Sequence, residues 1–296
     1  MGILVLGGSS QLGTQLRTLA LQQGVLLRAP TRAEIDLADS AAIQRIVAAG
    51  PWNVVIDAAG YTNVDRAESE EDVAHAINAD AAACLATETA KHKIPLIYIS
   101  TDYVFDGSKG APYIENDTAA PLNAYGRSKL AGERGVAAAN GRHIILRTAW
   151  LYSPHGTNFV RTILRLAQEQ ERLTIVADQV GCPTSARDLG QACLDIALRC
   201  AANPDRINYG LYHFAGAGAA TWFEFATAII EQAAGQLGLL PQVAPIPSIQ
   251  YPRPAIRPTD SRLDCTAIHR AFGLTPRPWR CALAETVECL LTRGRA

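Results

Sequence analysis

Short apolar runs alternate with longer amphipathic segments over the first 150 residues of the chain. Short runs rich in β-branched residues are typical of buried strands, and apolar residues at three- and four-residue spacing are typical of helices. The predicted strands are Ile3–Leu6, Val25–Leu27, Val54–Ile56, Leu96–Ile99 and Ile144–Leu146. The predicted helices are Gln11–Gln23, Ser40–Ala49, Val73–Lys91 and Tyr125–Ala139. This alternation predicts the α/β class, with a Rossmann-type, doubly wound parallel sheet covered by helices on both faces.

The regular alternation ends after Trp150. We expect a helix from near Asn158, a strand over Leu173–Val176, and a helix over residues 186–202 that packs back on the first domain. Proline is frequent in residues 241–258, so we expect no regular structure there. The pattern predicts a dinucleotide-binding domain at residues 1–150 and a smaller, partly irregular C-terminal substrate domain at residues 151–296.

Composition narrows the class of protein. The chain has 296 residues, 48% of them hydrophobic and 19% charged, with a net charge of −1 and basic residues scattered along it. A nucleic-acid partner is not expected from this distribution. Because no apolar stretch is long enough for a membrane span and the N-terminus does not resemble a signal peptide, we expect a cytoplasmic protein without a membrane partner. The seven cysteines are expected to be buried, unpaired core residues.

A glycine-rich loop follows the first predicted strand and leads into a helix. In this position glycines let backbone amides approach a pyrophosphate, and the helix N-terminus contributes partial positive charge. The spacing resembles Gly-x-x-Gly-x-x-Gly, but serine occupies the middle position, and an ordinary tight turn is the alternative interpretation. The predicted cofactor-binding residues in this loop are Gly7, Ser10, Gln11, Leu12 and Gly13.

Cofactor preference is predicted from the residues after the second strand. An acidic residue there is typical of NAD binding, but this chain has Arg28 and Arg32, and arginine can pair with a 2′-phosphate. We therefore favour NADPH, with NADH left open because both arginines can equally be solvated loop residues. Further cofactor contacts are expected at strand ends, from Asp36, Leu37, Ala58, Ala59, Gly60, Tyr61 and Thr62.

Tyr125 and Lys129 are four residues apart and are expected to share one helix face. Reduction of a ketone requires a proton donor, and a nearby lysine can move the pKa of a tyrosine towards the working range. Thr101 ends an apolar strand at the sheet edge where α/β proteins bind ligands, so its hydroxyl can donate to a substrate carbonyl. A chance Tyr-x-x-x-Lys match and a strand-end cap at Thr101 are the alternative interpretations.

Several segments together resemble the dTDP-4-dehydrorhamnose reductase family. The most specific are Ser100–Gly107, with the sequence STDYVFDG, and the Gln-x-Gly-x-Pro-Thr motif within Asp178–Thr184. The remaining matching segments are Asp57–Glu68, Pro121–Glu133, Arg147–Tyr152, Gly210–His213 and Arg257–Leu263. The resemblance therefore extends over nearly the whole chain.

The resemblance implies reduction of the C4 ketone of dTDP-4-dehydro-L-rhamnose to dTDP-L-rhamnose, the last step in making that nucleotide sugar. It implies that Tyr125 is the proton donor, that Lys129 tunes its pKa and anchors the cofactor ribose, and that Thr101 binds the carbonyl. The substrate-binding residues that it implies are Thr101, Asp102, Tyr103, Tyr125 and Trp150, with Arg257 as a diphosphate contact. Trp150 can equally be a core residue between domains.

Some relatives are thought to dimerise around magnesium held by carboxylates. Because the apparently corresponding position here is Gln15, we carry over neither the metal nor the dimer, and leave monomer and homodimer open. Two other functions stay open as alternatives: another sugar-nucleotide reductase or epimerase of the same fold, and a non-catalytic, dinucleotide-binding regulatory subunit. The joint presence of Thr101, Tyr125 and Lys129 favours an enzyme.

Overall fold

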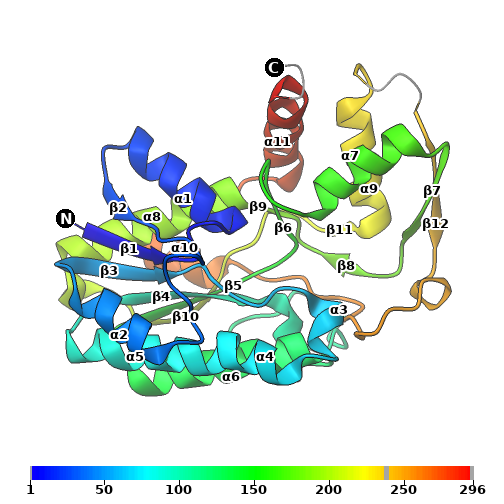
Figure 1. Cartoon of the computed structure of the whole chain (residues 1–296). Helices are drawn as coiled ribbons and strands as arrows, with labels where there is room; N and C mark the ends of the chain where they lie inside the picture. The colour runs from blue at the N-terminus through cyan, green and yellow to red at the C-terminus, as the bar shows by residue number, and fades with distance from the viewer. Residues whose placement is uncertain (1, 237–239, 294–296) are drawn as a thin grey trace.

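A six-stranded, fully parallel sheet forms the centre of the computed structural model, which describes residues 2–236 and 240–293 (Figure 1). The strand order is β10-β5-β4-β3-β1-β2. The strands are β1 (Gly2–Leu6), β2 (Leu26–Arg28), β3 (Trp52–Asp57), β4 (Leu96–Thr101), β5 (His143–Thr148) and β10 (Gly210–His213). From β1 the chain crosses to β2 on one side, and it then returns past β1 to β3, β4 and β5 on the other side. The strand order therefore reverses between β1 and β3, and an open α/β sheet binds its ligands at such a point. The predicted fold class is confirmed.

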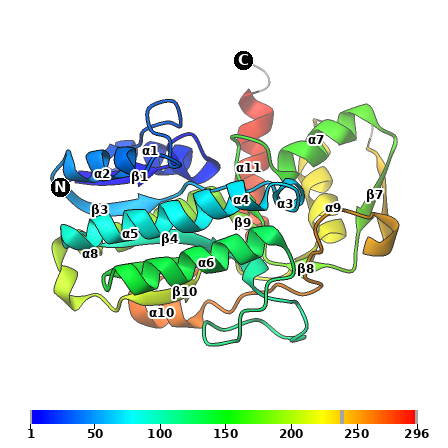
Figure 2. The same cartoon turned by 60° about the horizontal axis from the view of Figure 1, so that its bottom comes forward.

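Helices cover both faces of this sheet, as Figure 2 shows. One face carries α1 (Gln11–Gln22), α8 (Ala186–Ala202) and α10 (Thr266–Phe272), whose apolar residues pack with Ile3, Val5 and Ile56. The other face carries α2 (Ser40–Ala48), α5 (Ala81–Lys91) and α6 (Ala124–Ala139), which pack with Leu4, Leu6 and Val55. Successive strand residues thus point to opposite apolar layers, as burial on both faces requires.

The predicted helix over Val73–Lys91 is not regular along its length. It consists of α4 (Glu71–His75), a π-helical turn at Ala76–Asp80 and α5, and the short helix α3 (Val64–Ala67) precedes it. A π-helical turn widens the backbone locally and is frequent at functional sites. Here it includes Asn78, a residue 1% exposed.

A second lobe lies beside the sheet domain (Figure 1). It contains α7 (Phe159–Glu169), α9 (Trp222–Ala233) and α11 (Trp279–Arg293), which share an apolar core. Its short strands pair as β6 (Leu151–Tyr152) with β9 (Thr184–Ser185), β8 (Val180–Gly181) with β11 (Ala220–Thr221), and β7 (Arg172–Val176) with β12 (Gln242–Ile246). Single 3₁₀ turns occur at Asp102–Val104, Pro204–Arg206 and Ser248–Gln250.

The expectation of no regular structure in residues 241–258 was wrong for Gln242–Ile246, because β12 pairs there in parallel with β7. It is confirmed for residues 251–258, which form neither helix nor strand. Pro245 has no backbone N–H to donate, but an edge strand of a two-stranded sheet tolerates this loss. The division at residue 150 stays a prediction, and we propose it with α8, β10 and α10 assigned to the sheet domain. These three elements contribute to the same core as α1 and β1.

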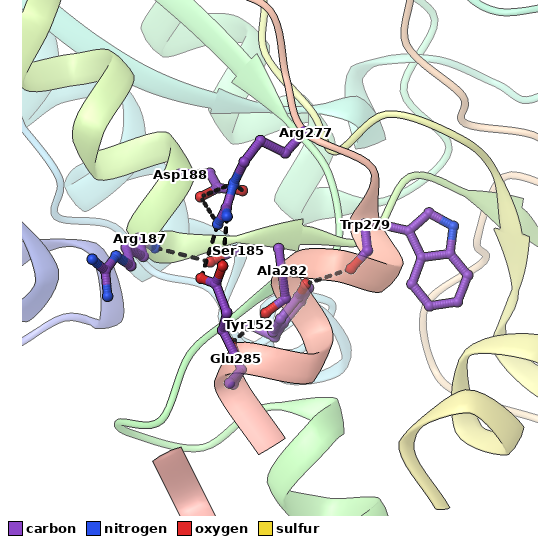
Figure 3. A network of polar contacts seen from close by, with 9 residues as sticks. Tyr152, Ser185, Arg187, Asp188, Arg277, Trp279, Ala282 and Glu285 are labelled. Carbon is purple, nitrogen blue, oxygen red and sulfur yellow. Dashed lines mark hydrogen bonds and ion pairs between the residues drawn. The ribbon is translucent and has the colours of Figure 1, made fainter. Parts of the chain in front are cut away.

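Arg277 ties the two parts of the chain together at α8 and α11 (Figure 3). Its guanidinium lies 2.7 Å from Asp188 of α8 and 2.6 Å from Glu285 of α11. Nearby, the Tyr152 hydroxyl donates a 3.2 Å hydrogen bond to the backbone oxygen of Trp279. The Arg277–Asp188 pair thus connects the segment before α11 to the sheet domain, and the Tyr152 hydrogen bond holds the start of α11 within the second lobe.

The seven cysteines differ in their burial. Cys182, Cys193 and Cys200 are buried as expected. The expectation was wrong for Cys281 of α11, which is exposed, and Cys84, Cys265 and Cys289 are only half-buried. In the part of the chain that the structure describes, no helix combines the length and apolar character of a membrane span.

Candidate active site

A cavity of about 610 Å³ opens at the carboxyl ends of β1, β3, β4 and β5. Several segments meet in it, among them the glycine-rich loop, the loop after β3, the end of β4, the start of α6 and the segment after β5. The sequence-predicted residues that line the cavity are Ser10, Gln11, Leu12, Ala58, Ala59, Gly60, Thr62, Thr101, Asp102, Tyr103, Tyr125, Lys129 and Trp150. Residues separated by more than a hundred positions in the sequence therefore share one site.

The glycine-rich loop fits a dinucleotide. Gly7 has a φ of +83°, and a Cβ atom there would come within 2.7 Å of the Ala59 backbone, so glycine is required. Ser10, which replaces the expected middle glycine, is the N-cap of α1, and its Oγ accepts a 2.9 Å hydrogen bond from Gly13. The α1 N-terminus, with its partial positive charge, faces the cavity through Ser10 and Gln11, as pyrophosphate binding requires.

Lys129 is almost fully buried on α6, at 4% exposure. Its Nζ lies 3.9 Å from the centroid of the Tyr98 ring, a cation–π contact. Burial lowers the pKa of Lys129 to about 8, while the charges of Asp57 and Glu133 act in the opposite direction. Lys129 is therefore poised to exchange a proton not far from neutral pH.

Tyr125 lies one turn before Lys129 on α6, where the side chain of Asn123 caps the helix by accepting a 2.8 Å hydrogen bond from Gly126. Burial raises the pKa of Tyr125 to about 12, against the opposing effect of the Thr101 hydroxyl. The downward shift expected from the sequence is thus not found for this chain, because burial removes the water that would stabilise a phenolate. The phenol is protonated at neutral pH, which is the form that a proton donor needs.

Thr101 connects Tyr125 with Asp102. Its hydroxyl donates a 3.0 Å hydrogen bond to Asp102 Oδ1 and accepts one of 3.2 Å from the Tyr103 backbone N–H. Asp102 is 2% exposed, and its Oδ2 has no hydrogen-bond partner within standard geometry among the described residues. Burial raises the pKa of Asp102 to about 7, against the opposing effects of the Ser261 and Thr101 hydroxyls. A buried oxygen of this kind is suited to a polar ligand that enters the cavity.

Behind these residues, a charged network joins β4, β5 and α6. Arg147 donates to both oxygens of Glu133, at 2.8 and 2.6 Å, and the Ser100 hydroxyl donates to Glu133 Oε1 at 2.5 Å. Two parallel hydrogen bonds fix both the distance and the orientation of the pair. The network therefore holds the end of β4 at a set position relative to Lys129.

Sequence reasoning missed Asn78. Its Oδ1 accepts a 2.8 Å hydrogen bond from the Tyr61 N–H, and its Nδ2 donates to the Tyr61 backbone oxygen at 3.0 Å and to Ser128 Oγ at 2.9 Å. It thereby joins the loop after β3 to the catalytic face of α6. The only sequence signal was a single asparagine inside a predicted apolar helix face.

A second cavity of about 610 Å³ lies next to the first and shares Tyr103 and Trp222 with it. It is lined in part by three cations, Arg172, Arg253 and Arg257. Arg257, the expected diphosphate contact, lies here, with its Nη1 2.9 Å from Asp65. The two cavities together offer apolar walls and a cluster of positive charge.

Trp150 has its ring stacked on Trp222, with centroids 3.4 Å apart and planes 5° apart. One face of its indole is thus already covered, although the side chain still lines the first cavity. The strained backbone of Trp150, with φ of +46°, marks the passage from β5 to the second lobe.

Some predicted cofactor residues do not line the cavity. Gly7 and Gly13 lie beneath the loop, where a Cβ atom would meet backbone. Arg32 and Asp36 are exposed beyond it, and Leu37 packs against the core on the α2 side. Tyr61 points away, donating a 2.6 Å hydrogen bond from its hydroxyl to Glu70.

Comparisons with known proteins point to one family. The family model described as RmlD substrate binding domain matches residues 1–292. A dTDP-4-dehydrorhamnose reductase from Sinorhizobium fredii is 39% identical over 295 residues, covering 100% of this chain and 99% of the relative. A solved dTDP-4-dehydrorhamnose reductase from Clostridium acetobutylicum is 34% identical with a TM-score of 0.91, covering 98% and 99%. One from Bacillus anthracis, solved in complex with NADP, is 33% identical with a TM-score of 0.89, covering 96% and 98%.

Proposed function

We propose that this chain, which belongs to the RmlD substrate binding domain family, reduces the C4 ketone of dTDP-4-dehydro-L-rhamnose to dTDP-L-rhamnose. It is an oxidoreductase that uses a nicotinamide cofactor, as its relatives are dTDP-4-dehydrorhamnose reductases and one was solved with NADP. In this function it would catalyse the last step in making that nucleotide sugar.

The observation that carries the proposal is the convergence of Thr101, Tyr125 and Lys129 on the cavity that the glycine-rich loop also lines. The cofactor, when bound, supplies a hydride to the carbonyl carbon. Tyr125 donates its phenolic proton to the carbonyl oxygen, in the protonated form that its high pKa favours. The Thr101 hydroxyl, whose single proton now points to Asp102 Oδ1, would turn that proton to the same carbonyl oxygen. The Lys129 ammonium would stabilise the phenolate left behind.

We propose that Ser10, Gln11, Leu12 and the loop after β3 hold the dinucleotide, with Lys129 also reaching its ribose. NADPH is the proposed cofactor, with NADH as the alternative. Arg28 and Arg32 are exposed near the end of β2, so either guanidinium can move to a 2′-phosphate at little cost in packing.

For the nucleotide sugar, the proposed site spans both cavities. The sugar would lie in the first cavity near Asp102 and Tyr103, and the diphosphate would lie by Arg253 and Arg257 in the second. Two phosphates carry more negative charge than Asp65, which now pairs with Arg257, so the ligand can compete for this guanidinium. A substrate that bridges the cavities is thereby positioned at both ends.

The test is nicotinamide oxidation with dTDP-4-dehydro-L-rhamnose generated in place, run with NADPH and NADH. Substrate-dependent oxidation that yields dTDP-L-rhamnose is expected, faster with NADPH. Arg32→Ala and Arg28→Ala are expected to raise KM for NADPH more than for NADH if these residues bind the 2′-phosphate. Oxidation with neither cofactor, while both bind, would refute the reductase and favour a regulatory subunit. A cofactor that stays tightly bound, together with isomerisation of the nucleotide sugar without net oxidation of the cofactor, would instead favour an epimerase.

A further inference from the structure

Asp57 is a buried carboxyl group that directly precedes Ala58 and Ala59, two residues that line the first cavity. It is the last residue of β3, is 5% exposed, and is paired in register with Tyr98 of β4. Its Oδ1 accepts a 3.2 Å hydrogen bond from the backbone N–H of Ala59, which lines the cavity. A buried carboxylate is costly unless hydrogen bonds or a cation compensate it. Besides the Ala59 hydrogen bond, a nearby cation is therefore expected to compensate the charge of Asp57.

Lys129 approaches Asp57 from α6. Its ammonium lies 3.9 Å from the centroid of the Tyr98 ring, and Tyr98 is the strand neighbour of Asp57. The Tyr98 hydroxyl donates a 2.8 Å hydrogen bond to the backbone oxygen of Asn78, which fixes the ring under the ammonium. Lys129 is the cation whose charge acts on Asp57. Because residues paired in register point to the same face of a sheet, Asp57 and the ammonium over Tyr98 lie in the same layer between the sheet and α6, without a direct ion pair.

The other groups that face Lys129 cannot replace Asp57. Tyr98 and Tyr125 carry neutral hydroxyls at neutral pH, because burial raises the pKa of each. Glu133 is negative, but Arg147 already binds both of its oxygens at 2.8 and 2.6 Å. Asp57 takes part in no such arginine pair within the described residues. The negative charge that remains available to Lys129 is that of Asp57.

We propose that Asp57 is a positioning residue for the reaction, whose carboxylate keeps Lys129 charged and seated on the Tyr98 ring, where it supports Tyr125. The inference rests on the proposed function for the role of Lys129. Burial raises the pKa of Asp57 to about 6 and lowers that of Lys129 to about 8, while each charge opposes the effect on the other. Both groups are therefore charged between these values. Without Asp57, burial would be opposed only by the Arg147-paired Glu133, and Lys129 would shift towards its neutral form.

The direct test is a pH titration of Lys129 by NMR. The chain holds four lysines, Lys91, Lys93, Lys109 and Lys129, so ¹³C-lysine labelling gives a simple spectrum, and the signal lost in Lys129→Arg gives the assignment. In the wild-type protein the Lys129 signal is expected to shift with a main midpoint near pH 8 and a smaller inflection near pH 6 from Asp57. In Asp57→Asn the main midpoint is expected to fall by about one pH unit, with loss of the smaller inflection.

An unchanged Lys129 midpoint in Asp57→Asn would overturn the proposal. Should Asp57→Asn fail to fold, the wild-type titration decides by itself, since a Lys129 signal without the inflection near pH 6 contradicts coupling to Asp57. Because this measurement needs no turnover, its result is independent of whether the chain reduces the proposed sugar.

Kinetics give the second readout. The ratio of wild-type to Asp57→Asn kcat/KM is expected to approach one near pH 6, where Asp57 is losing its charge in the wild type as well. At alkaline pH the ratio is expected to rise to about tenfold, the effect of a pKa one unit lower on the charged fraction of Lys129. A constant ratio at every pH would show a merely structural role and overturn the proposal. Asp205→Asn, an exposed carboxyl paired with Arg142 at 2.7 Å, is the matched control and should give a flat ratio near one.

Discussion

Replacement of Thr101 by valine removes one hydroxyl and keeps the branched shape of the side chain. The hydroxyl donates to Asp102 at 3.0 Å and accepts from the Tyr103 N–H at 3.2 Å, in a site only 5% exposed. Leaving these buried groups without a partner costs about 1–3 kcal/mol of unfolding free energy. The pKa of Asp102 should also rise above its value of about 7, because the Thr101 hydrogen bond favours the carboxylate.

The effect of Thr101→Val on turnover should exceed its effect on binding. If the hydroxyl stabilises the developing alkoxide, kcat/KM for the keto sugar should fall by about 100-fold, the usual cost of losing one such donor. The affinity for NADPH should change little. Cofactor oxidation under limiting substrate measures the first quantity, fluorescence titration the second, and denaturant unfolding the stability.

Thr101→Ser is the matched control, since serine keeps the hydroxyl and loses only the methyl group. It should retain most of the wild-type kcat/KM. Two results would refute the reasoning: Thr101→Val within about twofold of the wild type, or Thr101→Ser as impaired as Thr101→Val. Either would mean that the hydroxyl does not bind the reacting oxygen.

Three further predictions follow from the structure. Tyr125→Phe should keep NADPH affinity and lower kcat by on the order of 100-fold through loss of the acid, and unchanged turnover would exclude Tyr125 as donor. Gly132→Ala should lower the unfolding free energy by about 1–3 kcal/mol, because the new Cβ atom would overlap the backbone oxygen of Asn78. Gly141 faces open space, so the control Gly141→Ala should not lower the unfolding free energy in this way. Burial lowers the pKa of His213 to about 3, below its ordinary value of 6.5, so the unfolded chain binds the extra proton. Between about pH 6.5 and pH 3, stability should therefore fall by about 1.4 kcal/mol per pH unit from this group, and His213→Gln should flatten that slope in unfolding measurements.

The parts of the fold predicted from sequence are those encoded by local periodicity. The alternation of apolar strands and helices leads directly to the parallel sheet, and the four-residue spacing of Tyr125 and Lys129 leads to their shared helix face. Thr101 could be identified because strand ends gather at one edge of a parallel sheet. These inferences require no knowledge of long-range packing.

Other features depend on contacts between distant segments. The role of Asn78 requires a π-helical turn and the meeting of Tyr61 with Ser128, which lie 17 and 50 residues away from it. In the sequence, Asp57 is only the polar residue at the end of a predicted strand. Its proximity to Lys129 arises only when α6 packs on β4. The strand β12 was missed because prolines mask its pairing with β7, which begins 70 residues earlier (Gln242 pairs with Arg172).

The measurement that most directly tests the central claim is transfer of deuterium from [4-²H]NADPH, of the stereochemistry used by the enzyme, to the sugar. The account predicts dTDP-L-rhamnose with one deuterium, bound to C4 of the sugar, and loss of this product in Tyr125→Phe. Deuterium at another carbon, or product formed without deuterium from either face of the cofactor, would contradict reduction of the C4 ketone by this chain.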